Sequence, residues 1–188
     1  MPSPTTRRLP KAERQAQLVR AAAAAFVDGG FDGTSMESVA ERAGVTRLIV
    51  YRNFESKEAL YRAVLIDVTE QLREEFDGSQ PGEIAATLVR VARGRPDGFR
   101  LLWRHARHEP TFEMEARMFR LLADEDAASI VGRYIADATM RRWCASALVA
   151  YLLDGICTWL DEGDPERDDE FADRLSAGAR ALVDTWAD

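Results

Sequence analysis

Hydrophobic residues recur every three or four positions along most of the chain. The first such stretch places Leu18, Ala22 and Phe26 on one side of a helix, because an α-helix turns once in about 3.6 residues. The strict alternation that marks a half-buried strand is scarce. The pattern therefore predicts an all-α protein of about nine helices. The expected helices span residues 9–27, 34–43, 46–53, 56–76, 83–93, 97–108, 111–136, 139–161 and 167–187.

Turn-forming residues separate these stretches. Gly29-Gly30 ends the first helix and Gly44 separates the second from the third, since glycine readily takes the backbone conformations of turns. A further cluster of turn residues over 77–82 follows the fourth helix. We expect two domains: a three-helix helix-turn-helix domain over residues 1–55 and a helical bundle domain over residues 56–188.

The stretch from Val39 to Val50 has the spacing of a helix-turn-helix. Ala40 is small at a point where two helices cross closely, and Gly44 stands four residues later, where the turn takes a positive φ. Apolar contacts between the two helices would come from Val39, Ala43, Val45 and Val50. The third helix can then enter a major groove of DNA. A small three-helix packing that binds no DNA could show the same spacing, so this motif alone leaves both interpretations open.

The charge of the chain is distributed unevenly. The net charge of −7 argues against a nucleic-acid partner, but residues 1–62 carry 10 basic and 7 acidic side chains, a balance of +3. Residues 63–188 carry 15 basic and 25 acidic side chains, a balance of −10. This distribution suggests that the two parts have different roles, with the basic N-terminal part binding the phosphates of a nucleic acid. We expect residues 1–9 to form a loose basic arm and the protein to be cytoplasmic, because no signal-peptide pattern leads into the motif.

A longer pattern extends the helix-turn-helix on both sides. It reads Phe26-x4-Phe31-x2-Thr34-Ser35-Met36-x2-Val39-Ala40-x2-Ala43-Gly44-Val45-Thr46-x4-Tyr51-x2-Phe54-x-Ser56-Lys57-Glu58-x-Leu60. This run resembles the N-terminal domain of the TetR family of transcriptional regulators. The resemblance implies a DNA-binding transcriptional regulator, most simply a ligand-responsive repressor that binds a palindromic operator as a homodimer. It also implies that the C-terminal helical domain dimerises and binds a small effector.

Hydroxyl side chains stand where the second and third helices are expected to begin. Thr34, Ser35 and Thr46 occupy helix N-termini, where a hydroxyl and free N–H groups suit a phosphate. Glu37 is placed for a capping box on Thr34. We expect the three hydroxyl residues to contact the DNA backbone; the alternative is that they are helix caps and nothing more.

The third helix and the start of the fourth carry the remaining DNA-binding candidates. Arg47, Leu48 and Arg52 are expected to face the groove. Arg47 could pair with guanine or a phosphate, and Leu48 could touch a thymine methyl group. The resemblance implies that Tyr51 and Lys57 are the family's phosphate-contacting tyrosine and lysine.

The last two predicted helices are apolar over more than one stripe. A surface wider than one core-facing stripe predicts two partners, the protein's own core and a second subunit. The alternative is that both helices lie wholly inside one subunit. The candidates for the dimer interface are Leu148, Leu152, Trp159, Phe171, Leu175 and Leu182.

Large apolar residues also gather in the middle of the chain. They could line an effector cavity, because methionine and aromatic side chains suit varied ligands, or they could be ordinary core. We expect any ligand to be small, largely apolar, and uncharged or weakly cationic. The candidates for the effector pocket are Phe99, Leu102, Trp103, Phe112, Met118, Phe119 and Leu122.

Catalytic and metal chemistry find little support in the sequence. His105 and Glu109 lie one turn apart on a predicted helix, but a third metal ligand is missing. A helical enzyme that used His105, His108 and Glu109 would lack a nucleophile–base pair and a cofactor motif, so we expect neither an enzyme nor a cofactor. An interaction module with a non-specific basic end is the other alternative. The longest apolar stretch, residues 143–153, is too short to cross a bilayer, so no membrane partner is expected.

Overall fold

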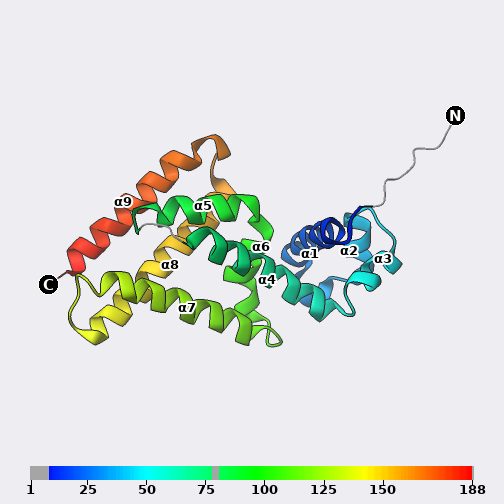
Figure 1. The fold of residues 1–188 in the computed structure, drawn as a ribbon, viewed down its shortest axis with the longest axis horizontal. Coiled ribbons are helices and arrows are strands. Elements are labelled where there is room, and N and C mark those ends of the chain that lie inside the picture. Colours follow the sequence, from blue (N-terminus) through cyan, green and yellow to red (C-terminus); the bar gives the residue numbers. More distant parts are fainter. Residues whose placement is uncertain (1–8, 78–80, 188) are drawn as a thin grey trace. The chain divides into compact units, whose positions relative to one another are not determined.

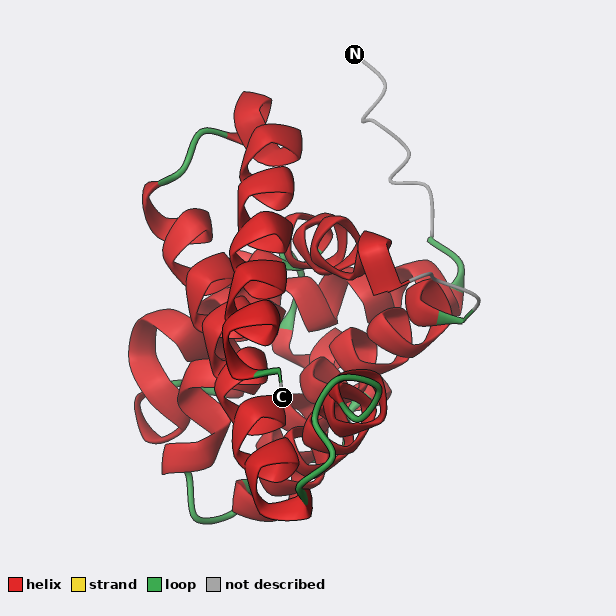
Figure 2. Ribbon diagram, turned by 90° about the vertical axis from the view of Figure 1, so that its left-hand side faces the viewer, coloured by secondary structure: helices red, strands yellow, loops and turns green. Residues whose placement is uncertain are grey.

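The computed structural model describes residues 9–77 and 81–187, and within these ranges it contains helices and loops but no strand. Its α-helices are α1 (Lys11–Gly33), α2 (Met36–Arg42), α3 (Arg47–Asn53), α4 (Lys57–Phe76), α5 (Ile84–Gly94), α6 (Pro96–Arg100), α7 (Glu113–Val131), α8 (Ala138–Glu162) and α9 (Asp168–Trp186). Figure 1 labels these helices and Figure 2 distinguishes them from the loops. The all-α fold class predicted from the sequence is confirmed.

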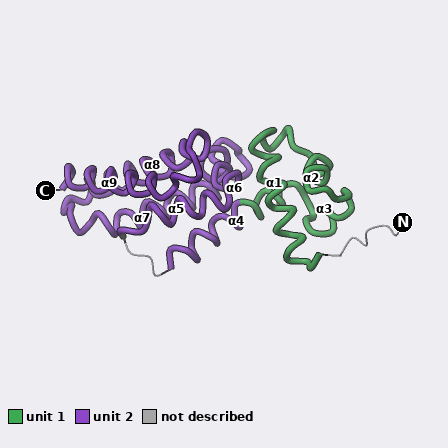
Figure 3. The backbone as a smooth tube through the Cα atoms, turned by 90° about the horizontal axis from the view of Figure 1, so that it is seen from above, with its two compact units in different colours: residues 1–64 green, residues 65–188 purple. Residues whose placement is uncertain are grey.

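The chain divides into two compact units, residues 1–64 and residues 65–188, which Figure 3 shows in different colours. The boundary falls inside α4, so the first unit contains α1 to α3 with the start of α4. The division expected after residue 55 concerns function and stays a prediction. Of the basic arm expected over residues 1–9, residues 1–8 lie outside the described part of the chain.

Three aromatic rings hold the first unit together. Helix α1 is broken at Gly30, where φ is 68°, and beyond the break the Phe31 ring lies 6.0 Å from that of Phe26. Tyr61 of α4 meets both rings nearly edge-on, with centroid distances of 4.9 Å to Phe26 and 5.5 Å to Phe31. All three side chains are buried, and burial of an aromatic side chain stabilises a fold by roughly 1.5–3 kcal/mol. The cluster therefore ties the first helix of the unit to its last.

The second unit is built around α8, which contacts α5, α6, α7 and α9. By length and apolar composition alone, α8 could cross a bilayer, a test that the core helix of a helical bundle also passes. Here its inward side is buried against four neighbouring helices. The expected absence of a membrane partner stays a prediction.

The helix predicted over residues 97–108 contains three kinds of turn. Helix α6 leads into a π-helical segment, Leu101–His105, and a 3₁₀ turn follows over Ala106–His108. The N–H of Ala106 donates to the carbonyl of Leu101, five residues back, which is the bonding pattern of a π-helix. Leu101, Leu102 and Trp103 are all buried. This segment therefore departs from the regular helix predicted over residues 97–108 in its backbone bonding.

Helix α7 is shorter than the stretch predicted over residues 111–136. It ends at Val131, and Arg141 of α8 fixes the path of the chain that follows. The Arg141 guanidinium donates to the carbonyls of Ile135 and Ala136 at 3.1 and 2.8 Å. These bonds hold the loop between α7 and α8 by satisfying two carbonyls that a helix ending at residue 136 would also have left without an internal partner.

Helices α8 and α9 approach closely. A Cβ built on Gly178 of α9 would collide with the hydroxyl of Tyr151 on α8, so glycine leaves the space that the tyrosine occupies. Further along, Trp159 stacks on Phe171 with ring centroids 4.5 Å apart. The Trp159 indole also donates to Asp168 Oδ1 at 2.7 Å. The helix pair is therefore held by specific contacts as well as by apolar burial.

The six candidates for the dimer interface fall into two groups. Leu148 and Leu175 are buried in the core of the subunit, so neither side chain is available to a second subunit and their assignment is wrong. Helical spacing shows that these positions are apolar, but it does not show whether they face the core of the subunit or its outer surface. The half-buried candidates, which stay predictions, are Leu152, Trp159, Phe171 and Leu182.

Candidate nucleic-acid interface and effector pocket

The turn between α2 and α3 has the geometry of a helix-turn-helix. Gly44 has a φ of 64°, a conformation that other residues rarely adopt. The N–H of Val45 donates to the Ala40 carbonyl at 2.9 Å and closes the turn. From α1, Gln17 Nε2 donates to the Ala43 carbonyl at 2.7 Å. These bonds fix the beginning of α3 within the unit.

Helix α3 buries one face and presents the other outward. Val50 is fully buried, whereas Leu48 is 58% exposed and Tyr51 is 41% exposed. Arg47 and Arg52 are exposed as well. These four outward side chains follow at positions i, i+1, i+4 and i+5, which share one side of a helix. An outward helix with two guanidinium groups has the form of a recognition helix that enters a DNA groove.

Two neighbours hold Arg47 at the surface. Its guanidinium forms an ion pair with Glu37 of α2 and donates to the Tyr51 hydroxyl at 3.2 Å. The guanidinium carbon also lies 5.0 Å from the centre of the Tyr51 ring. The sequence indicated Arg47 and Tyr51 but missed Glu37 as a member of the site, because this pairing depends on how α2 crosses α3.

The hydroxyls at the beginnings of α2 and α3 differ in their bonding. Ser35 caps α2: its Oγ accepts from the Ser38 N–H, and the Ser38 Oγ accepts from the Ser35 N–H, both at 3.1 Å. The capping box therefore joins Ser35 to Ser38, and the box predicted between Thr34 and Glu37 is wrong. Thr46 stands at the N-cap of α3, but its side chain makes no capping bond. Its exposed hydroxyl is open to another acceptor.

The Thr34 side chain faces inward. It is 4% exposed, and its hydroxyl lies 3.0 Å from the Ala25 carbonyl and 2.7 Å from the Gly30 carbonyl. A hydroxyl has one proton to donate, and here that proton serves the break in α1. The predicted phosphate contact through this side chain is therefore wrong.

Lys57 opens α4 and is tied to the last turn of α1, beyond the break at Gly30. Its Nζ donates to the Phe31 carbonyl at 2.7 Å and lies 4.2 Å from the centre of the Phe31 ring. An ammonium group has three donors, so two remain for a phosphate. The contact that the resemblance implies stays a prediction, with a structural role for Lys57 beside it.

Comparison with known proteins decides the family. Residues 18–64 match the sequence profile of bacterial regulatory proteins of the tetR family. The HTH-type transcriptional activator FasR of Mycolicibacterium smegmatis is 30% identical over 169 residues, which cover 84% of this chain and 77% of that protein. This chain belongs to the TetR family. It is therefore a transcriptional regulator and not an enzyme.

Solved structures of TetR-family regulators share the fold. A TetR-like transcriptional regulator from Rhodococcus sp. RHA1 aligns with a TM-score of 0.74 and 24% identity, over 94% of this chain and 99% of that one. NalD, the secondary repressor of the MexAB-OprM multidrug efflux pump in Pseudomonas aeruginosa, aligns with a TM-score of 0.65 and 20% identity, over 91% and 95% of the two chains. At these identities the likeness establishes the fold alone.

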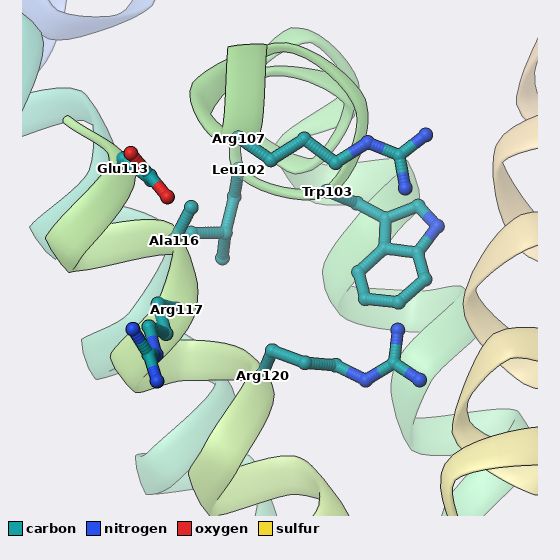
Figure 4. Close-up of a pocket in the computed structure, with 7 residues that line it drawn as sticks. All are labelled: Leu102, Trp103, Arg107, Glu113, Ala116, Arg117 and Arg120. Atoms are coloured by element: carbon teal, nitrogen blue, oxygen red, sulfur yellow. The ribbon is translucent and has the colours of Figure 1, made fainter. Parts of the chain in front are cut away.

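The second unit of this TetR-family regulator contains a cavity of about 320 Å³. The cavity lies between the π-helical segment and α7, as Figure 4 shows. Two of the predicted effector-pocket residues, Leu102 and Trp103, line it. The lining consists of Leu102, Trp103, Arg107, Glu113, Ala116, Arg117 and Arg120. The sequence did not indicate the three arginines, because apolar spacing does not show which charged side chains come together from separate helical segments.

The other effector-pocket candidates do not line this cavity. Phe99 and Phe112 are buried in the core, and Phe119 is half-buried. Met118 and Leu122 are 51% and 55% exposed and do not line this cavity, so their assignment to a pocket stays a prediction. Helical spacing showed that α7 has apolar residues on more than one side, but not which side faces inward.

The residues with catalytic or metal-binding chemistry are not assembled into a site. Glu109 follows the 3₁₀ turn with φ −103° and ψ 107°, so it does not share a regular helical turn with His105. Among the described residues, no group of three His, Cys, Asp or Glu side chains is placed to hold a metal. Burial, together with Arg104, lowers the pKa of His105. Burial raises the pKa of the Cys157 thiol to about 11, which keeps it protonated and unreactive at neutral pH.

Proposed function

We propose that this protein is a ligand-responsive transcriptional repressor that binds a two-fold symmetric operator as a homodimer in the bacterial cytoplasm. The outward face of α3 carries the proposal. With Val50 buried, Leu48 and the two arginines of α3 face away from the unit. A guanidinium can pair with O6 and N7 of guanine, and an apolar side chain can contact a thymine methyl group. The exposed set therefore suits a major groove.

The size of the reading surface favours a dimer. Helix α3 has seven residues, and one such helix contacts few base pairs. Two copies held about 34–36 Å apart would read successive turns on the same side of the DNA. The outer face of α8 supports a second subunit, because Trp143 is 54% exposed there, with Ala147 and Tyr151 one and two turns further on. The negative charge of residues 63–188 disfavours contact between the body and phosphate.

Activation of transcription is the alternative to repression. Repression requires only that the bound dimer occupies promoter DNA, whereas activation requires an additional contact with the transcription machinery. The name of FasR, a transcriptional activator, supports activation as the second candidate. Transcription in vitro from a promoter that carries the selected operator decides between them: added protein lowers the transcript yield if it represses and raises it if it activates.

Selection of bound fragments from the source genome is the experiment that tests DNA recognition. The expected product is a two-fold symmetric site that the protein distinguishes from unrelated duplexes near physiological salt. Arg47→Ala should change the preference at one position of each half-site, because a bidentate contact discriminates by about 1–3 kcal/mol. Fluorescence anisotropy on single-base variants of the operator measures this change.

Thr46→Val provides a complementary test of backbone contact. The Thr46 hydroxyl caps no helix bond, so its removal should leave the folded state intact while it weakens operator and unrelated duplexes by a similar factor. Arg142→Ala, an exposed change on α8, is the control and should leave both affinities unchanged. Binding that loses all sequence preference at physiological salt would contradict the proposal, because non-specific complexes rest on phosphate charge alone.

A further inference from the structure

The cavity beside α7 has an apolar floor. Leu102 and Trp103 on the π-helical segment and Ala116 on α7 are all buried and all line the cavity. The Trp103 indole is fixed in place, because its Nε1 donates to Asp154 Oδ1 on α8 at 2.6 Å. A fixed aromatic floor offers a flat apolar surface to a ligand without loss of side-chain freedom on binding.

The rim of the same cavity is basic. Arg107, Arg117 and Arg120 stand against one acidic residue, Glu113. Figure 4 shows the guanidinium groups of Arg107 and Arg120 extending to the same side as the Trp103 indole. Arg120 lies over that indole, with its guanidinium carbon 5.1 Å from the ring. The rim is therefore cationic where it meets the apolar floor, within a unit whose overall charge is negative.

Of the three rim arginines, Arg120 has an acidic partner, whereas Arg107 and Arg117 have none among the described residues. Arg120 pairs with Asp124 at 2.9 Å and donates to Ser146 Oγ at 2.6 Å. Arg107 donates to His108 Nε2 at 3.0 Å, and no carboxylate within the described residues forms an ion pair with it or with Arg117.

Arginines just before Arg107 along the chain have acidic partners. Arg100 and Arg104 both pair with Asp161 of α8, at 2.8 and 2.6 Å. The same stretch of chain thus neutralises the guanidinium groups that face α8 and leaves the one that reaches the cavity without a carboxylate. Planar guanidinium groups match carboxylate and phosphate oxygens in pairs of hydrogen bonds.

The backbone at this cavity is irregular as well. Trp103 lies within the π-helical segment Leu101–His105, and such insertions occur frequently at functional sites. This observation is independent of the charges. Leu102 and Trp103, which line the cavity, both lie in this segment.

We propose that this cavity binds a small organic anion, with its acidic head group on Arg107 and its apolar body against Leu102 and Trp103. This ligand differs in charge from the uncharged or weakly cationic one expected from the sequence. A role for this anion as the effector rests on the proposed function; the binding itself does not. The volume of about 320 Å³ falls at the lower end of the range of about 300–1,000 Å³ for small-molecule sites.

Calorimetric titration of the full-length protein tests the proposal with three probes of one shape. They are 2-naphthoate, 2-naphthamide and 2-naphthylmethylammonium, which carry a negative, a neutral and a positive head on the same ring system. The naphthoate should bind at least about tenfold more tightly than the other two, because only a carboxylate gains charge-assisted bonds from the rim. Equal affinity for all three probes, or no binding of the naphthoate, overturns the proposal.

Variants of the rim locate the site. Arg107→Gln should weaken naphthoate binding by about tenfold, and Arg107→Lys should retain part of the affinity. Figure 4 shows the Arg117 guanidinium on the side away from Trp103, so Arg117→Gln should have a smaller effect. Arg142→Gln removes an exposed arginine from α8 outside the cavity and should bind as the wild type does. Unaltered naphthoate affinity in Arg107→Gln overturns the assignment. If Arg107→Gln changes the thermal unfolding of the protein, loss of naphthoate binding in Ala116→Leu, which fills the apolar floor, tests the site instead.

Binding to DNA is measured separately, so the two proposals can fail independently. Anion binding is recorded without DNA, and operator binding is recorded without the anion. A protein that binds naphthoate and ignores every duplex rejects the proposed function alone. A protein that binds its operator and no naphthoate rejects the anion site alone.

Discussion

Arg47, which we propose reads the DNA, already has two partners in the free protein. Its partners, Glu37 and Tyr51, lie on two different helices. A carboxylate beside the reading face repels phosphate, so Glu37 opposes non-specific binding while it holds the guanidinium in one place. We infer that Glu37 contributes to discrimination between sequences more than to affinity.

Glu37→Gln should raise affinity for unrelated duplexes and narrow the difference between operator and non-operator DNA. The change removes a negative charge near phosphate and frees Arg47 to contact the backbone. The slope of log affinity against log salt should steepen by up to about one unit. Stability should change by less than about 1 kcal/mol, because exposed ion pairs contribute little. Anisotropy titrations over a salt series, with urea unfolding alongside, measure both.

Glu41→Gln is the matched control for this prediction. It makes the same charge change on the same helix at an exposed position that forms no ion pair with Arg47 among the described residues. If the two variants gain the same affinity for unrelated DNA, net charge alone explains the effect and the role assigned to Glu37 is wrong.

Individual residues show which features of the site could be predicted from the sequence and which could not. Gly44 was predictable because few residues other than glycine take a positive φ readily in a tight turn. Thr34 was misassigned because position at a helix start does not tell which way a hydroxyl points. Met118 and Leu122 do not line the cavity, because helical spacing does not tell which apolar side of α7 faces it. The cationic rim of the cavity depends on Arg107 and Arg120 lining it from separate helical segments, which no local pattern records.

At the scale of helices, a charged bridge joins α5 to α9. Arg93 donates two hydrogen bonds to Asp168, at 2.9 and 2.7 Å, and Trp159 of α8 donates a third at 2.7 Å. Hydrogen bonds from Arg93, and then from Trp159, lower the pKa of Asp168, against the opposing effect of burial. Three helices thus meet at one carboxylate.

Asp168→Asn should lower the free energy of unfolding by roughly 1–3 kcal/mol at pH 7, because it removes the charge that three donors share. The folded pKa lies below the unfolded value of about 3.9, so the unfolded state binds more protons between the two values. The contribution is therefore complete above about pH 5 and is lost as pH falls through the folded pKa. Urea unfolding at pH 7, 5 and 4 should show the difference from wild type beginning to shrink only at the lowest pH.

Asp169→Asn is the control at the neighbouring exposed position of α9. It makes the same charge change in the first helical turn and should cost much less stability. Equal losses for the two variants, or a difference from wild type that does not vary with pH, would show that the bridge does not act through ionised Asp168.

Most helices of this fold could be placed from the sequence, because strong apolar periodicity and glycine or proline breaks agree over α1, α5, α8 and α9. The region between α5 and α7 could not. Its π-helical segment and 3₁₀ turn depart from the regular helical period on which the sequence prediction rests. The loop after α7 is held by bonds from Arg141 in the next helix, a contact that no local sequence pattern records.

At the scale of the whole molecule, the outer face of α8 is the surface that a dimer would use. Trp143, Ala147 and Tyr151 follow each other at four-residue spacing along it. Trp143 and Tyr151 are exposed and Ala147 is half-buried, which leaves room for a second helix at the alanine. A surface of this kind, apolar and lined with a small residue, packs well against a symmetric copy of itself.

Ala147→Glu should convert the dimer to a monomer. In a symmetric interface the substitution brings two carboxylates together, and like charges at an interface cost several kcal/mol. Light scattering should then give a mass of about 21.0 kDa at micromolar concentration, and affinity for the complete operator should fall towards that for a half-site. Ala138→Glu, at the first residue of α8, is the control and should leave the mass at twice that value. A wild-type protein that is already monomeric with full operator affinity would reject the dimer.

The contact between Gly178 and Tyr151 constrains how this surface can diverge. A side chain at position 178 would displace the hydroxyl end of the Tyr151 side chain, and a larger side chain would displace the ring further. The displaced phenol ring would then project from the face that the proposed dimer uses. Related chains should consequently change these two positions together, with a larger residue at 178 accompanied by a smaller one at 151. A pair of regulators in one cell that differ there would be expected to assemble with themselves and to reject each other.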